Sequence, residues 1–324
     1  MTLPRITVVA MGGTIAGSAN SPTDATAYRA ATTGIDDLIA AVPELAQVAT
    51  LTGEQFAQID SSDLTNELLL GLARRIAELA DDPAVDGIVI THGTDTLEET
   101  AYLLHLTIRS TTPIVVVGAM RPPTALSSDG QRNIYAAVVA AASVSAVGQG
   151  VLVVMNDEIH SARDVTKTSS LRLDAFRSAH GPLGIVVDGR ALFYRSVSRL
   201  HTAATEFAIP DRLPRSAILY AHSGLDDRFI DDLDYDVIVH AGFGNGTVSR
   251  RVVDALEAQR QRGTVVVRAS RSDGNLTRIG ASDGVANSWL VVDDQNPERA
   301  RLLASLALTI TADASEIQQL FYRY

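Results

Sequence analysis

Short apolar runs alternate with stretches of helical periodicity along most of the chain. The runs are β-branched, continuous rather than alternating in polarity, and bounded by Gly, Pro or Asp, which is typical of strands buried on both faces of a sheet. We predict such strands at residues 5–11, 87–91, 114–117 and 151–155.

Helices are predicted between these strands. One apolar helical face ends at Asp81-Asp82-Pro83 and is marked by Leu68, Leu72, Ile76 and Leu79. Thr96 and Glu99 have the spacing of a capping box, which predicts a helix from there to about residue 105. An Ala/Val-rich helix is predicted at 133–145.

This alternation predicts an α/β protein whose larger N-terminal domain, residues 1–192, contains a mostly parallel, doubly wound sheet. The pattern loosens at 193–214, which we interpret as a linker. Residues 215–324 are predicted to form a smaller C-terminal α/β domain, with strands at 217–220, 237–241 and 264–268 and helices at 249–261, 298–309 and 315–321.

Charge and composition narrow the classes of function. A net charge of −11 and the absence of a basic run disfavour nucleic acids and anionic membranes as partners. The absence of cysteine excludes disulfides, thiolate catalysis and cysteine-ligated metals. No apolar stretch approaches the roughly 20 residues of a membrane span, and no leader precedes the first apolar run, so a cytoplasmic location is expected unless a leader has been removed.

The first motif that can carry chemistry is GGTIAG, which follows the first predicted strand and contains Gly13 and Thr14. Open α/β sheets bind ligands at this edge, and glycines expose backbone amides there. A purely structural or phosphate-binding glycine turn is the alternative. The motif fits neither the dinucleotide fingerprint nor the phosphate-binding loop that contains a lysine.

The second motif is HGTDT, where Thr94 and Asp95 stand between a strand and a helix. A helix cap needs neither of these two side chains, which favours a functional role for them. The third motif contains Lys167, the only lysine of the chain. A solvated surface position is the ordinary expectation for it, although a desolvated lysine can act as a base where arginine cannot. The histidines are scattered and HExxH is absent, and His222-Ser223-Gly224 lacks the spacing of a nucleophile elbow, so metal and serine-hydrolase chemistry are disfavoured.

Four blocks resemble the bacterial L-asparaginase family, closest to its type II branch: MGGTIAG, THGTDTLEETAYLL, GAMRPPTALSSDGQRN and MNDEIHSARDVTKT. IDSSDLTN and the C-terminal IQQLFYRY extend the similarity over nearly the whole chain. The resemblance implies two α/β domains in a homotetramer, a dimer of intimate dimers with the sites between partners. It also implies a small amino-acid amide as substrate and no metal or organic cofactor.

The resemblance also assigns roles to individual residues. Thr14 matches the threonine that attacks the amide and becomes acylated, and Tyr28 matches a tyrosine on a flexible loop that helps to activate it. Thr94, Asp95 and Lys167 match a second group, in which Lys polarises Thr and Asp holds Lys. Substrate binding is assigned to Gly13, Ser61, Ser62, Thr94 and Asp95, with Ser61 at the α-carboxylate and Asp95 at the α-ammonium group.

Three positions depart from the family pattern. Met11 replaces the usual Thr beside the nucleophile, and Ser62 replaces the Gln or Glu common in type II relatives. The acidic residue that relatives contribute from the neighbouring subunit has no clear match, Asp283 being nearby. We expect hydrolysis of L-asparagine through an acyl-threonine. The alternatives are a glutaminase-asparaginase of broader specificity and a non-catalytic amino-acid-binding protein on the same scaffold.

Overall fold

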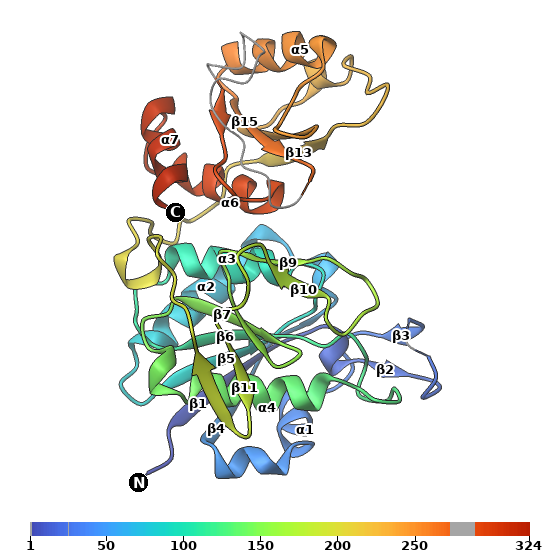
Figure 1. The fold of residues 1–324 in the computed structure, drawn as a ribbon, viewed down its shortest axis with the longest axis vertical. Coiled ribbons are helices and arrows are strands. Elements are labelled where there is room, and N and C mark those ends of the chain that lie inside the picture. The colour runs from blue at the N-terminus through green and yellow to red at the C-terminus, as the bar shows by residue number, and fades with distance from the viewer. Residues whose placement is uncertain (1, 25, 273–288) are drawn as a thin grey trace. The chain divides into compact units, whose positions relative to one another are not determined.

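The computed structural model describes residues 2–24, 26–272 and 289–324. The chain divides into two compact units, one up to Ile209 and one from Pro210 onward, and this boundary lies inside the segment 193–214. Each unit has its own sheet (Figure 1). The prediction of a two-domain α/β protein with the larger domain first is therefore confirmed.

The described part of the N-terminal unit contains an eight-stranded sheet in the order β12-β11-β8-β7-β6-β5-β1-β4. The strands from β4 to β7 run parallel, while β8, β11 and β12 extend the sheet as antiparallel strands. In chain order the eight strands are β1 Arg5–Gly12, β4 Thr50–Ile59, β5 Gly87–Thr91, β6 Ile114–Val117, β7 Val151–Met155, β8 Glu158–Ser161, β11 Gly184–Val187 and β12 Arg190–Phe193.

Two short hairpins accompany this sheet. One pairs β2 with β3, and the other pairs β9 with β10. Their strands are β2 Ser18–Ala19, β3 Tyr28–Arg29, β9 Val165–Lys167 and β10 Phe176–Ser178.

Helices cover both faces of the N-terminal sheet (Figure 1). On one face lie α2 Asn66–Asp81 and α3 Leu97–Thr107, and on the other lie α1 Ile35–Ala40 and α4 Gly130–Ala141. The predicted apolar face of α2 is buried at Leu72, Ile76 and Leu79, whereas Leu68 is only half-buried. Burying one such side chain contributes roughly 1.5–3 kcal/mol, so this face fixes the helix on the sheet.

The capping box predicted at the start of α3 is wrong in its hydrogen bonds. Thr96 occupies the N-cap position, but its side chain makes no capping bond. Instead its hydroxyl donates to the carbonyl of Ser61 over 2.9 Å. The Thr96 hydroxyl therefore ties the loop after β4 to the start of α3, a long-range contact that local spacing cannot reveal.

The C-terminal unit contains four parallel strands in the order β13-β14-β15-β16 among its described residues. On one face of this sheet, Val252 and Leu256 of α5 pack with Ile238, Val266 and Trp289, and α6 and α7 lie on the other face (Figure 1). The elements are β13 Ser216–Tyr220, β14 Val237–Gly242, β15 Val265–Ser270, β16 Leu290–Val291, α5 Arg250–Gln261, α6 Pro297–Ala307 and α7 Ala314–Arg323.

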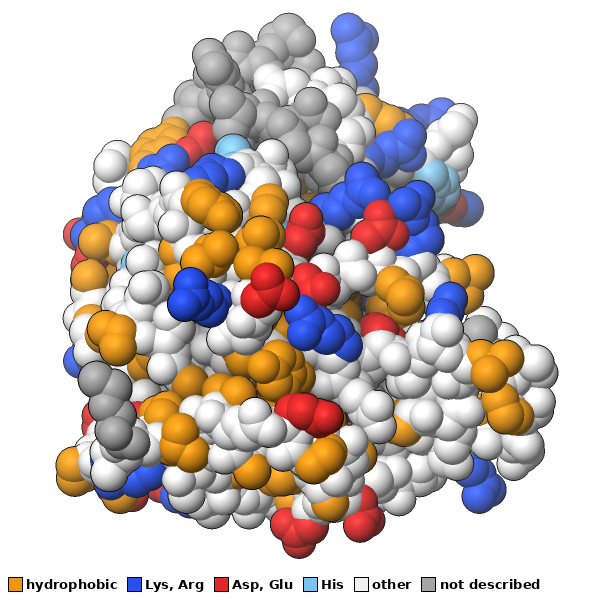
Figure 2. Space-filling model, turned by 60° about the horizontal axis from the view of Figure 1, so that its bottom comes forward, with side chains coloured by type: hydrophobic (Ala, Val, Ile, Leu, Met, Phe, Trp, Pro, Cys, Tyr) orange, Lys and Arg blue, Asp and Glu red, His pale blue; other side chains and the backbone are white. Residues whose placement is uncertain are grey.

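Acidic and basic side chains are mixed on the surface. Figure 2 shows acidic side chains standing among the basic ones on the face that it draws, so this face offers no purely basic surface to a phosphate backbone. Among the described residues, every helix is too short or too polar to traverse a bilayer.

Several histidines are buried in the interiors of the two units. Burial lowers the pKa of His160 and of His240 to about 4, because the charged imidazolium loses its hydration in the interior. His105 is fully buried, accepts the Val151 N–H at Nδ1 over 3.1 Å, and has a pKa well below its usual value for the same reason. These side chains are neutral in the folded protein and become protonated more readily in the unfolded chain.

We predict that the free energy of unfolding falls as the pH drops from about 6.5 towards about 4. In that window the unfolded state binds more protons than the native state, so stability rises with pH, by up to about 2 kcal/mol per histidine between pH 5 and pH 7. Urea unfolding followed by circular dichroism at the two pH values measures the difference. His240→Phe removes one titrating group, so its pH dependence should be shallower. Equal stability of the wild type at pH 5 and pH 7 would contradict the prediction.

Candidate active site

The turns after β1 and β5 meet at the carboxyl edge of the N-terminal sheet. The two strands are parallel neighbours, so their last residues lie side by side. Gly13 has a φ of 78°, and a Cβ built on it would lie 2.3 Å from the Cα of Gly93. Only glycine fits this approach. It brings the loop that contains Thr14 against the loop that contains Thr94.

Thr14 begins a single 3-10 turn, Thr14–Ala16, directly after this glycine. Its side chain is buried, and its Oγ1 lies 2.6 Å from the hydroxyl of Tyr28, with either oxygen able to donate the proton. Tyr28 stands in β3, opposite Ala19 of β2. This short ladder is not among the predicted strands, because each of its strands has only two residues.

Lys167 connects Thr94 and Asp95. Its Nζ donates to Thr94 Oγ1 over 2.8 Å and to Asp95 Oδ1 over 2.5 Å. The Lys167 side chain is 16% exposed, so the ordinary expectation of a solvated lysine is wrong here, while Asp95 is 64% exposed. Because Thr94 Oγ1 accepts a hydrogen bond from the Lys167 ammonium group, the Thr94 hydroxyl proton is free to be donated to an acceptor in the pocket.

These side chains face one small pocket of about 190 Å³. The residues that line it are Thr14, Thr26, Tyr28, Thr94, Asp95, Met120, Lys167 and Ser170. Sequence reasoning missed three of them, namely Thr26, Met120 and Ser170. Met120 lies in the GAMRPP block and Ser170 follows the block that contains Lys167, so both were within quoted motifs or beside them. The pocket wall is polar except for Met120.

Three residues predicted to bind substrate, Ser61, Ser62 and Gly13, are not among those that line the pocket. Ser61 is buried, and a Cβ on Gly93 would lie 2.6 Å from its Oγ. Ser62 is exposed and donates its hydroxyl to Asp60 Oδ1 over 2.9 Å. The N–H of Gly13 donates to the Ile59 carbonyl over 2.9 Å, so it is occupied within the protein. The structure supports a different contribution of Gly13, which is to let its own turn pack closely against Gly93.

Two other positions depart from the family pattern, Met11 and Asp283. Met11 is buried near the end of β1, next to the glycine turn. Asp283 lies outside the described residues.

His92 holds the turn after β5 from the interior of the unit, and it is not among the residues predicted for the site. It is fully buried, with Nδ1 2.7 Å from the carbonyl of Gly93 and Nε2 3.0 Å from Thr100 Oγ1 on α3. Burial lowers its pKa to about 4, so the imidazole is neutral at neutral pH. A neutral ring donates from Nδ1 and accepts at Nε2, which matches these two partners.

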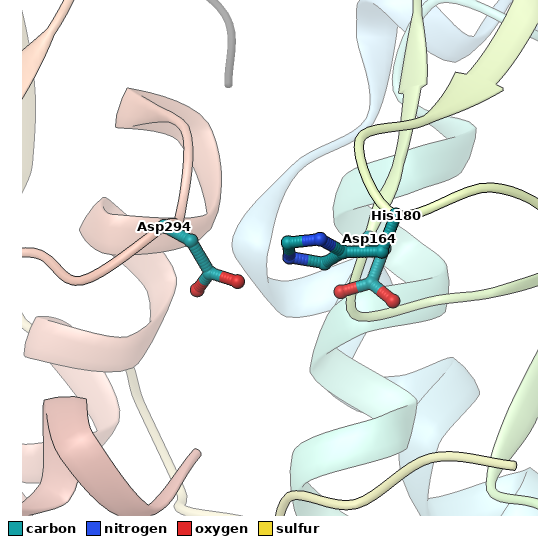
Figure 3. A group of neighbouring side chains, drawn as sticks. All are labelled: Asp164, His180 and Asp294. Carbon is teal, nitrogen blue, oxygen red and sulfur yellow. The ribbon is translucent and has the colours of Figure 1, made fainter. Parts of the chain in front are cut away.

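A carboxylate and an imidazole also stand near the block that contains Lys167. Figure 3 shows Asp164 and His180, whose candidate ligand atoms lie within 4.8 Å of each other. Asp164 also accepts from Arg163 over 3.0 Å. Asp294, labelled in the same view, belongs to the C-terminal unit. The N-terminal unit alone therefore offers two ligands, fewer than the three or four protein ligands of a zinc site, and we assign no metal to them.

Two hydroxyl groups, each hydrogen-bonded to a side chain that can carry a proton, open into one polar pocket at the sheet edge where α/β proteins bind ligands. The fold and this arrangement are those of a two-domain α/β enzyme with a small polar site. The Asparaginase, N-terminal family matches residues 5–199, and the Glutaminase/Asparaginase C-terminal domain matches residues 215–321. The chain belongs to the asparaginase family, which confirms the predicted resemblance.

Individual relatives agree with this assignment over the full chain. The glutaminase-asparaginase of Pseudomonas fluorescens biotype A is 47% identical over 99% of this chain and 91% of its own length. L-asparaginase 2 of Escherichia coli (strain K12) is 42% identical over 100% of this chain and 94% of its own. The crystal structure of a probable cytoplasmic L-asparaginase from Campylobacter jejuni superposes with a TM-score of 0.95 at 42% identity, covering 99% of this chain and 100% of that one.

Replacing Gly13 by Ala should abolish most activity and lower stability by about 1–3 kcal/mol, the scale of cost for a residue forced into strained backbone. The new Cβ would have to displace Gly93, so the Thr14 and Thr94 loops would move apart. Gly34→Ala is the matched control, because Gly34 has a φ of −76° and nothing lies within 4 Å of an added Cβ. Ammonia release from L-asparagine and thermal unfolding are measured on both variants. If Gly13→Ala behaves like Gly34→Ala, the close approach has no functional role.

Proposed function

We propose that the chain hydrolyses L-asparagine to L-aspartate and ammonia through an ester on Thr14. The observation that supports this most directly is the pair of hydroxyls, Thr14 and Thr94, each hydrogen-bonded to its own partner and both facing one pocket. The family assignment and relatives named L-asparaginase and glutaminase-asparaginase support asparagine as the substrate. Hydrolysis through an acyl-enzyme needs a nucleophile and a way to move protons, and the pocket contains both.

In the first step, Thr14 Oγ1 attacks the carbon of the side-chain amide. The Thr14 proton passes towards the Tyr28 hydroxyl 2.6 Å away, so the attacking oxygen gains nucleophilicity as the new bond forms. The carbon–nitrogen bond then breaks, and the nitrogen takes up a proton and leaves as ammonia. An aspartyl ester of Thr14 remains.

In the second step, water attacks the ester carbon, the bond from that carbon to Thr14 Oγ1 breaks, and Thr14 Oγ1 takes back a proton as aspartate leaves. We assign the activation of water, and the polarisation of the amide before it, to Thr94 with Lys167 and Asp95 behind it. Lys167 donates to Thr94 Oγ1, which favours release of the Thr94 proton towards the substrate. Asp95 holds the ammonium group in place from the solvent side.

Residues at and beside the pocket also orient the substrate. Asp95 is exposed at the pocket and carries the charge that complements an α-ammonium group. We assign the α-carboxylate to Ser61 and its neighbour Ser62, and we propose a role for Gly13 at the same end. The side-chain amide then points towards Thr14. Because one methylene in a pocket changes selectivity by only about 1–3 kcal/mol, activity on glutamine is measured beside activity on asparagine.

We also propose the homotetramer implied by the family resemblance, in which each site lies between two intimate partners. Analytical ultracentrifugation with a parallel activity assay tests this, and a fully active monomer would contradict it. A cytoplasmic location stays a prediction, since one relative is named cytoplasmic and another, from Haemophilus influenzae, periplasmic.

Thr14→Ala should lower kcat for asparagine by at least about a thousandfold, the scale seen when a nucleophile is removed from a hydrolase, with aspartate binding retained. Thr23→Ala is the control. Thr23 is an exposed threonine between β2 and β3, and its hydroxyl contacts Ser21. Ammonia release and calorimetric binding of aspartate separate chemistry from binding. Near-normal turnover by Thr14→Ala would refute the proposed nucleophile.

Lys167→Met should lower kcat by about a hundredfold or more, and Lys167→Arg should not restore it. The compact ammonium reaches Thr94 and Asp95 together at 2.8 and 2.5 Å, whereas a planar guanidinium is longer and presents a fork. Steady-state kinetics on the two variants test the assignment, with circular dichroism to confirm folding. An arginine variant with wild-type kcat would show that any cation suffices at this position.

A further inference from the structure

The hairpin formed by β2 and β3, here called the Tyr28 hairpin, is too small to hold itself in place. Its ladder has two residue pairs, Ser18 with Arg29 and Ala19 with Tyr28. An isolated two-stranded hairpin is marginal in water even when it is longer. Contacts outside the ladder must therefore fix the position of Tyr28 against Thr14.

Two such contacts come from the loop between β6 and α4, residues 118–129. The N–H of Ala19 donates to Thr124 Oγ1 over 2.8 Å, and the N–H of Leu126 donates to the carbonyl of Pro22 over 2.8 Å. The first acts on the residue that pairs directly with Tyr28. The second acts near the tip of the hairpin.

The loop that supplies these contacts is itself anchored. Asp129 accepts the N–H groups of Met120 and Arg121, each over 2.9 Å, and the side-chain amide of Asn133 over 3.0 Å. Asn133 is buried in α4 and also donates to the carbonyl of Gly118. Thr124 therefore projects from a loop whose two ends are fixed to the sheet and to α4. Met120 on this loop lines the pocket.

We propose that Thr124 is a positioning residue for the reaction, whose hydroxyl holds the Tyr28 hairpin so that the phenol stays within reach of Thr14. The proposal rests on the proposed function, in which Tyr28 takes up the Thr14 proton. Thr124 lies outside the pocket lining, so its effect passes through the Ala19–Tyr28 pair.

The exposed position of Thr124 allows a positioning role in the reaction to be distinguished from a role in folding stability. Its side chain is exposed, so losing the hydroxyl leaves no buried group unsatisfied. The Ala19 N–H then turns to water, which makes the hairpin more mobile without unfolding the domain. Transition-state geometry is more sensitive to such mobility than substrate binding is, so kcat should respond more than KM.

Three variants test the proposal. Thr124→Val keeps the shape and removes the acceptor, and we expect kcat for asparagine to fall about fivefold to tenfold, the range for one lost hydrogen bond, with KM and thermal stability nearly unchanged. Thr124→Ser keeps the hydroxyl and should restore kcat. Thr23→Val is the matched control on the hairpin and should match the wild type. Hydrogen exchange at the Ala19 amide should be faster only in Thr124→Val.

A double-mutant cycle with Tyr28→Phe decides whether Thr124 acts through Tyr28. If it does, Thr124→Val should change kcat by less than about twofold in the Tyr28→Phe background. Effects that multiply would overturn the proposal while leaving the role of Tyr28 intact, as would wild-type kcat for Thr124→Val. Wild-type kcat for Tyr28→Phe alone would refute the proposed role of Tyr28, and the positioning role with it.

Discussion

The close approach of two glycine turns is the constraint on which the site depends. Gly13 and Gly93 follow adjacent parallel strands. A Cβ on Gly13 would lie 2.3 Å from the Cα of Gly93, and a Cβ on Gly93 would lie 2.6 Å from Ser61 Oγ, so neither position accepts a side chain. Thr14 comes one residue after the first glycine and Thr94 one residue after the second. The sheet therefore sets the separation of the two hydroxyls, and the glycines allow both to face one pocket of about 190 Å³.

The groups around this contact are fixed in different ways. His92 holds the Gly93 turn through two neutral hydrogen bonds in the interior, where an imidazolium would be costly. Lys167 is largely covered and is held by Thr94 and by Asp95 at the solvent edge. Tyr28 approaches from a two-residue strand, which is the least constrained support in the site. Thr14 and Thr94 are thus held by turns at the ends of adjacent strands of the sheet, whereas Tyr28, the hydrogen-bond partner of Thr14, is held by a small hairpin.

The parallel strands were predictable from sequence because they are buried on both faces. Continuous β-branched runs located β5, β6 and β7 with the bounds that the structure has. β4 and the antiparallel extension were missed because β4 and β12 are partly exposed edge strands, β8 contains polar residues, and β11 alternates between buried and more exposed positions. Such strands lack the continuous, fully buried apolar run on which the predictions relied.

The candidate site was predictable to the extent that its residues lie in motifs. Thr14, Thr94 and Asp95 follow strands directly, so their meeting at one edge follows from topology. Lys167 and Tyr28 were assigned only through the family resemblance, since they reach the pocket from hairpins whose positions depend on tertiary contacts. Met120 and His92 lie inside quoted blocks, but nothing in the sequence pattern marked either of them as part of the site. Met120 enters through a loop anchored by Asp129, and His92 acts from within the core.

Whether Thr14 becomes acylated can be measured directly by quenching the protein in acid during turnover of L-asparagine and mapping its peptides by mass spectrometry. The geometry at Thr14 predicts an aspartyl ester on the peptide that contains Thr14, and no ester when Thr14 is replaced by Ala. An ester on the peptide that contains Thr94, or one that persists in the Thr14→Ala variant, would contradict the proposed mechanism.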